Sequence, residues 1–111
     1  MTDLIELSQD DYGYTYTITL YTKADSTSVE NLSAASSVSL DITRLDATPI
    51  VNDATVTVSD AANGVLQFTP ESTWFSSSNL NGQSHYVAIF KINYGSGIKH
   101  SFKIPLYVHL H

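Results

Sequence analysis

The side chains best suited to chemistry in this sequence are four histidines and eleven acidic residues. His109 and His111 lie two positions apart, so on a strand both point to one face, where copies of the chain around a symmetry axis could bind a metal. A solvent-exposed chain end explains the same pair without a metal. His85 and His100 have no serine or acidic partner at a spacing typical of a hydrolytic triad. The histidines therefore predict neither catalysis nor a required metal.

The acidic residues are better explained by turns and solvent than by catalysis. Asp10 and Asp11 are adjacent, so on an extended chain they point in opposite directions and cannot easily share a ligand. A calcium site would need several oxygens to converge, and the spacing of the remaining aspartates matches no recognised calcium loop. The chain has no cysteine and no nucleotide-binding motif. We therefore expect a protein that is not an enzyme and needs no cofactor.

The net charge of the chain argues against two classes of binding partner. The formal net charge is −6, which argues against nucleic acid and against anionic lipid, and no apolar run is long enough to span a membrane. All the acidic residues lie within residues 1–71, whereas Lys91, Lys99 and Lys103 follow with no acid among them. Two interpretations stay open. Strands from both halves interleave and mix the charges, or two faces of opposite sign steer docking to a partner or to a second copy.

The tyrosines and the tryptophan supply candidates for a binding surface. Most of the tyrosines lie on stripes that should face the core, including Tyr14. Tyr21, Tyr107 and Trp74 lie off these stripes, so we expect them at an interface, where aromatic side chains often dominate binding. Exposed, the same rings could instead stack on a sugar. Lys103 and His109 complete the interface candidates, because they point outward from the last strand pattern.

The elements that must position these side chains follow an alternation of period two, which is typical of half-buried strands. Threonine and other β-branched residues fill the alternate positions, as suits a pleated sheet. The apolar stripes begin in residues 4–7 and 14–20, continue in 38–42, 54–58 and 66–68, and are longest in 86–94 and 102–110.

Turn residues separate these stripes. Asp46 to Pro49 is typical of a turn, Asn63-Gly64 supplies residues that tolerate positive φ, and Gly95-Ser96-Gly97 predicts a hairpin. Residues 70–81 form the longest gap. Its Trp74-Phe75 pair predicts a turn of helix that plugs one end of the core. About seven strands at roughly 8–12-residue spacing predict an all-β, immunoglobulin-like Greek-key β-sandwich, with residues 1–111 as one domain.

Two segments carry a resemblance to a known family. They are residues 29–35, Val-Glu-Asn-Leu-Ser-Ala-Ala, and residues 60–70, Asp-Ala-Ala-Asn-Gly-Val-Leu-Gln-Phe-Thr-Pro. The order of features resembles the N-terminal domain of phage baseplate upper proteins and related immunoglobulin-like modules of phage tails and fibres. This resemblance implies a virion structural protein, located in the virion, that acts through contacts with other virion proteins or with copies of itself. The alternative is a carbohydrate-binding or adhesin-like sandwich that uses Trp74 as a sugar platform.

The last strand pattern, Phe102 to His111, is the expected assembly element. Pro105 lacks a backbone donor, which fits an edge strand, and an edge carries unpaired backbone groups that another chain can complete. Proline and charge also serve to block such pairing in many sandwiches, so both interpretations stay open. If the strand assembles the protein, removing Leu106 to His111 should leave a weakened sandwich that no longer assembles.

Overall fold

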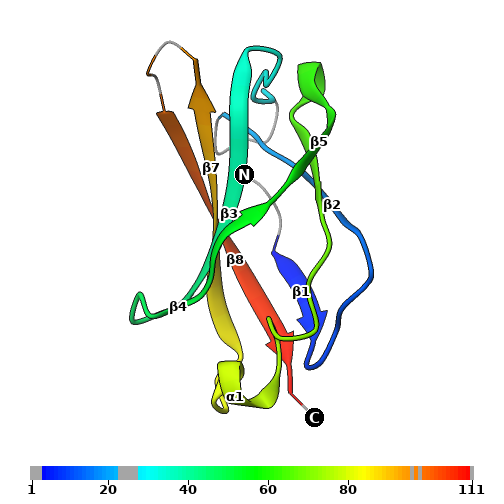
Figure 1. The fold of residues 1–111 in the computed structure, drawn as a ribbon, viewed down its shortest axis with the longest axis vertical. Coiled ribbons are helices and arrows are strands. Elements are labelled where there is room, and N and C mark those ends of the chain that lie inside the picture. Colours follow the sequence, from blue (N-terminus) through cyan, green and yellow to red (C-terminus); the bar gives the residue numbers. More distant parts are fainter. Residues whose placement is uncertain (1–3, 23–27, 96, 98, 111) are drawn as a thin grey trace.

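The protein folds into two stacked β-sheets (Figure 1). The computed structural model describes residues 4–22, 28–95, 97 and 99–110. The expected all-β sandwich is confirmed, with eight strands where about seven were predicted. They are β1 (Ile5–Ser8), β2 (Tyr16–Thr19), β3 (Ala35–Arg44), β4 (Pro49–Thr55), β5 (Thr57–Asp60), β6 (Val65–Phe68), β7 (His85–Tyr94) and β8 (Lys99–His109).

The larger sheet has the strand order β1-β8-β7-β3-β4, and the smaller one has the order β2-β6-β5. Every pairing is antiparallel except the one between β1 and β8. The chain changes sheets between β4 and β5 through the single residue Val56, which is buried. The sequence predicted one strand across residues 54–58, because an alternation of period two does not reveal which sheet a strand joins.

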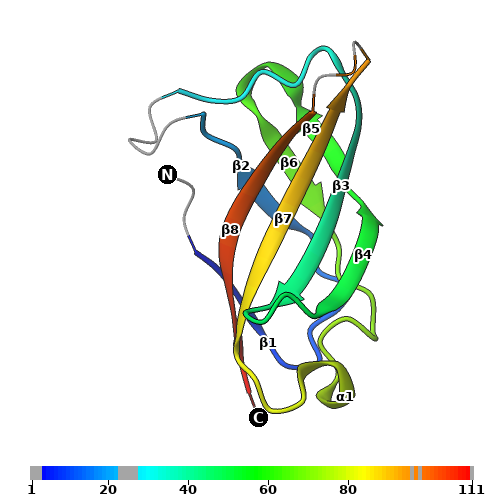
Figure 2. The ribbon, with the colours of Figure 1, turned by 90° about the vertical axis from the view of Figure 1, so that its left-hand side faces the viewer.

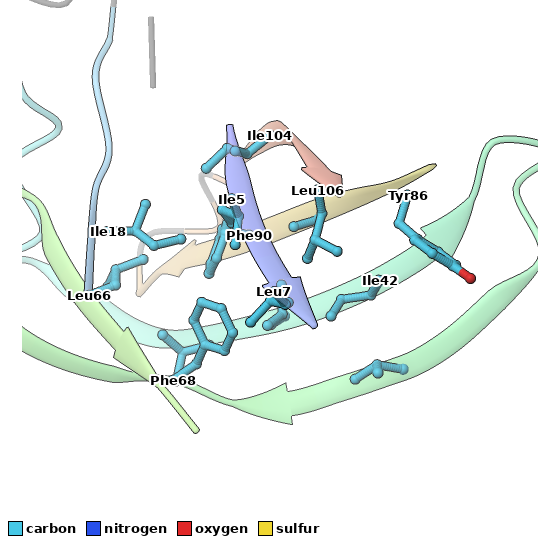
Figure 3. Packing of buried hydrophobic residues seen from close by; sticks show 14 of the residues in the cluster. Ile5, Leu7, Ile18, Ile42, Leu66, Phe68, Tyr86, Phe90, Ile104 and Leu106 are labelled. Atoms are coloured by element: carbon cyan, nitrogen blue, oxygen red, sulfur yellow. The ribbon is translucent and has the colours of Figure 1, made fainter. Parts of the chain in front are cut away.

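The core lies between the sheets and uses the predicted stripes. Leu40 and Ile42 of β3, Ala88, Phe90 and Ile92 of β7, and Ile104, Leu106 and Val108 of β8 are all buried. Figure 3 shows side chains of both sheets meeting around Phe90. Tyr14 was expected on a core stripe and is 68% exposed, because β2 begins only at Tyr16. Leu110, at the end of the last stripe, is also exposed.

The long gap closes one end of the sandwich, as predicted. A single helical turn, α1 (Ser77–Leu80), begins after Ser76, whose side chain accepts a hydrogen bond from the backbone N–H of Asn79. Phe75 and Leu80 are buried. The Tyr86 hydroxyl holds the segment through contacts with the carbonyls of Leu80, at 3.1 Å, and Gln83, at 2.7 Å.

The turn at Asn63-Gly64 closes the other end. A short 3₁₀ turn, η1 (Ala61–Asn63), precedes Gly64, which has the expected positive φ of 68°. A Cβ at this position would lie 2.6 Å from the carbonyl oxygen of Glu30. Glycine is therefore required both by the left-handed backbone and by the close approach of the neighbouring chain.

The expectation that the last strand lies at a sheet edge is only half right. β8 lies between β7 and β1, and Leu106 and Tyr107 are paired with both of these strands. Residues 99–104 pair with β7 alone among the described strands. No helix in the described ranges is long and apolar enough to cross a bilayer.

Candidate functional site

The outer face of the five-stranded sheet gathers three of the predicted interface residues. Lys103, Tyr107 and His109 are alternate residues of β8 and point away from the core, where even-numbered neighbours such as Leu106 are buried. The Tyr107 ring makes edge-on contacts with two imidazoles. Its centroid lies 5.1 Å from that of His85 and 4.7 Å from that of His109. Figure 2 looks onto this face, with β8, β7, β3 and β4 side by side.

A shallow apolar hollow of about 410 Å³ lies beside this aromatic stack. Its floor is Val87 of β7 and Pro105 of β8, which are opposite each other in the register. Leu45, which is 70% exposed, and Leu4, which is 48% exposed, form its walls. Large apolar side chains that share one hollow on a sheet face mark a contact surface more often than scattered ones do.

Charges of opposite sign occupy the two ends of one row of the sheet, and one of them, Lys103, also lines the hollow. Asp41 of β3 and Lys103 of β8 are both opposite Ile89 of β7, so they occupy the two ends of the same row. On the acidic side, the Lys91 ammonium lies 3.0 Å from Asp41 and 2.5 Å from Asp53. Hydrogen bonds to Asp53 and Asp41 raise the pKa of Lys91, so the cluster carries two carboxylates and one ammonium. Lys103 makes no ion pair within the described residues.

Trp74 is not part of this surface. Its side chain is only 7% exposed, and it stacks on Phe68 and contacts Phe75 edge-on. The expectation of an interface or sugar-stacking residue is wrong here, because the 70–81 segment folds back over the open end of the core and buries its two large rings. Tyr21 is half-buried and forms an isolated bridge with Val29, beyond the end of β2. Tyr21 does not line the hollow beside Tyr107.

Glu30 is the one buried charged residue among those described. Its carboxylate accepts hydrogen bonds from the Tyr94 hydroxyl at 2.5 Å and lies 2.8 Å from Nδ1 of His100. Burial, and then the hydrogen bond to Glu30, raise the pKa of Tyr94 to about 12. The backbone N–H of Glu30 also donates to Leu20. This cluster ties the segment before β3 to the β7–β8 hairpin, which is a structural task.

The three described histidines do not converge on a metal site. His109 Nε2 lies 3.2 Å from Glu6, and His85 Nδ1 lies 3.1 Å from the Ser84 hydroxyl. No group of three or more potential metal ligands occurs in the part of the chain that the structure describes. The predicted pairing of His109 with His111 cannot be placed, because His111 lies outside the described residues. Asp11 caps local structure, accepting hydrogen bonds from the Ser8 backbone and the Tyr16 hydroxyl.

Sequence reasoning missed the hollow and the charged row. Val87 and Leu45 were not singled out, because each is one apolar residue at an outward position of an otherwise regular alternation. The signal was present in β7, where the outward positions hold Val87 and Ile89 as well as Lys91. Apolar residues on both faces of a strand indicate that both faces are covered.

Comparisons with known proteins concern the fold only. No protein-family model matches the sequence, and no curated protein matches it. Six solved chains match in structure. One is the crystal structure of CopC from Methylosinus trichosporium OB3b, which has a TM-score of 0.54 and 10% sequence identity. The match covers 100% of this chain and 87% of that one.

This comparison corrects the expected virion function and virion location. The neighbour described above is CopC, not a phage protein. The segments that carried the phage resemblance, residues 29–35 and 60–70, are turn and core residues in the structure, and such residues specify a fold that hosts many functions. At 10% identity the likeness to CopC also shows the fold alone. By its strand order and this likeness, the chain is an immunoglobulin-like Greek-key β-sandwich.

Proposed function

We propose that this chain is a non-catalytic assembly module, in which the outer face of the five-stranded sheet binds the same face of a second copy. The observation that carries the proposal is the apolar hollow with opposite charges at the two ends of one row. Copper binding is not proposed, since the described residues offer no group of three ligands to support it.

The register supports a symmetric contact. A two-fold axis that runs along β7 places β8 of one copy over β3 of the other. Lys103 then faces the acidic cluster of Asp41 and Asp53, which carries a surplus negative charge. Each such contact occurs twice, as in any two-fold interface. Val87 and Ile89 lie near the axis, where apolar side chains of the two copies pack on each other.

The size of the surface fits this arrangement. The molecule measures 40 × 26 × 26 Å, and the five-stranded sheet lies along the long dimension. A stable interface buries about 800 Å² on each partner, which is less than the footprint of one such face. Aligned sheets pack about 10 Å apart with their apolar side chains interdigitated.

The test is a charge exchange followed by sedimentation equilibrium. Lys103→Asp and Asp53→Lys each bring like charges together twice in the dimer, so each variant alone should sediment as a monomer. An equimolar mixture of the two should recover the dimer, because both contacts then pair opposite charges. Lys99→Asp, on the same face but outside the hollow, is the matched control and should dimerise as the parent does. A monomeric parent, or a mixture that stays monomeric, overturns the proposal.

A further inference from the structure

We infer that the free edge of β8 at residues 99–104 accepts an extended, acidic segment of a different protein as an added β-strand. This surface is the edge of the sheet, whereas the proposed dimer uses its face. The inference does not depend on the dimer.

Within the described residues this edge is open, because β1 begins only at Ile5. β8 has eleven residues, and β1 pairs only with Leu106 to His109. On the side away from β7, no described strand lies next to residues 99–104. Figure 2 shows the upper part of β8 as the outermost strand of its sheet. Unpaired backbone groups along such an edge can be completed by a strand from another chain.

The register fixes which backbone groups point outward. Pro105 has no N–H to donate, and it lies opposite Val87, so this pair is one without reciprocal hydrogen bonds. The alternation then directs the N–H and C=O groups of Lys103, Ser101 and Lys99 away from β7. Two observed hydrogen bonds agree with this assignment of outward and inward backbone groups. His109 accepts on the outer side from the backbone N–H of Gln9, at 2.8 Å. Val108 donates on the other side, to the Ser84 carbonyl.

The charge of this edge selects the partner. Lys99 and Lys103 are exposed and make no ion pair within the described residues. No acidic residue follows Glu71 in the sequence. A second copy of β8 is a poor partner. Antiparallel pairing about Ser101 would place Lys99 opposite Lys103 twice, and like charges directly opposite each other destabilise a sheet. An added strand with acidic residues at alternate positions places carboxylates beside both lysines.

The inward side of the edge offers room for apolar side chains. Phe102, which packs against the core, is only partly buried. The inferred ligand therefore alternates acidic side chains, on the outer face, with apolar side chains that point inward.

The experiment uses the full chain and a short synthetic peptide that alternates glutamate with valine. A peptide that alternates lysine with valine serves as the control probe. We expect the glutamate peptide to slow amide hydrogen exchange at Lys99, Ser101 and Lys103 by at least about tenfold, since strand pairing protects amides. The lysine peptide should leave these rates unchanged. Equal protection by both peptides, no protection by either, or amides already protected without peptide would each overturn the inference.

Two variants separate edge addition from other causes. Ser101→Pro removes an outward N–H while sparing the bonds to β7, as Pro105 does in the natural sequence, so it should abolish peptide protection at Lys99 and Lys103. Ser101→Thr keeps the N–H and should bind as the parent does. The double variant Lys99→Glu with Lys103→Glu should reverse the preference, so that it binds the lysine peptide and not the glutamate peptide. Unchanged peptide binding by Ser101→Pro, with its fold intact, overturns the inference. The proposed dimer, which uses the Val87 face, is tested separately, and its outcome does not depend on this result.

Discussion

At the scale of single residues, Phe90 joins the two sheets through its packing in the core. Its side chain is fully buried at the centre of β7, and its ring lies 6.0 Å from that of Phe68 in the facing sheet. Phe90→Ala should lower the free energy of unfolding by about 3–5 kcal/mol, the usual cost of emptying a large aromatic site in a core. Urea unfolding measures this directly. A loss below about 1 kcal/mol would be typical of a surface position and would contradict the packing.

Tyr94 and Tyr16 give the fold a dependence on alkaline pH. Burial, with a neighbouring carboxylate in each case, raises the pKa of both phenols to about 12 from the ordinary 10.0. The unfolded chain loses these protons near pH 10, whereas the folded chain keeps them until about pH 12. The stabilising contribution is therefore complete below pH 10 and disappears as pH rises through 12.

Thermal unfolding between pH 9 and pH 12 tests this dependence. Tyr94→Phe should flatten the fall in melting temperature over that range relative to the parent, because the phenol that ionises in the unfolded state is gone. Tyr12→Phe, at an exposed ring, is the control and should keep the parent slope. A Tyr94→Phe slope as steep as the parent's would show that Tyr94 contributes nothing to it.

Residues on regular stripes could be assigned from the sequence, whereas Trp74 fitted two predictions, a plug over the core and an interface. Phe90 and Leu106 lie in long alternating runs, so their burial follows from the pleat of a strand. Trp74 lies in a segment with no period, where burial depends on which way the chain folds back over the end of the sheets. The hollow at Val87 escaped notice for a related reason, because a lone apolar residue on an outward position is common and signals little by itself.

At the scale of elements, the alternation predicted where strands run but not how they are joined. The change of sheet at Val56 and the parallel pairing of β1 with β8 are tertiary choices, set by packing between residues far apart in sequence. Only part of β8 lies at an edge of the sheet, because β1 is shorter than β8. Four residues of β1 cover four of β8, and nothing in the β8 pattern itself marks the boundary.

This placement changes the expected result of a truncation. Removing residues 106–111 deletes Leu106 and Val108, which are buried, and leaves β1 without its partner strand. The truncated chain should therefore fail to fold, where the sequence suggested a weakened sandwich that survives. Far-ultraviolet circular dichroism should lose its β-sheet signal. As a control, removing only His111 should leave the spectrum unchanged. A truncated chain that still unfolds cooperatively would contradict the central position of β8.

At the scale of the whole molecule, the two sheets present different outer faces. The three-stranded sheet turns Thr17 and other polar residues to solvent, whereas the five-stranded sheet exposes Leu45 beside Val87, Pro105 and the Tyr107 stack. A net charge of −6 repels copies of the chain from one another at long range. Association therefore needs a local surface that combines apolar area with paired charges, and among the described residues the β7–β8 face does so.

The two outer faces should respond differently to an added charge. Val87→Asp places a carboxylate near the proposed two-fold axis, where two copies bring two like charges together in an apolar contact, so the dimer should dissociate. Thr17→Asp adds the same charge to the other sheet and should leave the dimer intact. Sedimentation equilibrium reports the mass, and unchanged urea midpoints establish that both variants are folded. If Thr17→Asp dissociates the dimer and Val87→Asp does not, the copies meet through the three-stranded sheet, and the charged row on β3 and β8 has another purpose.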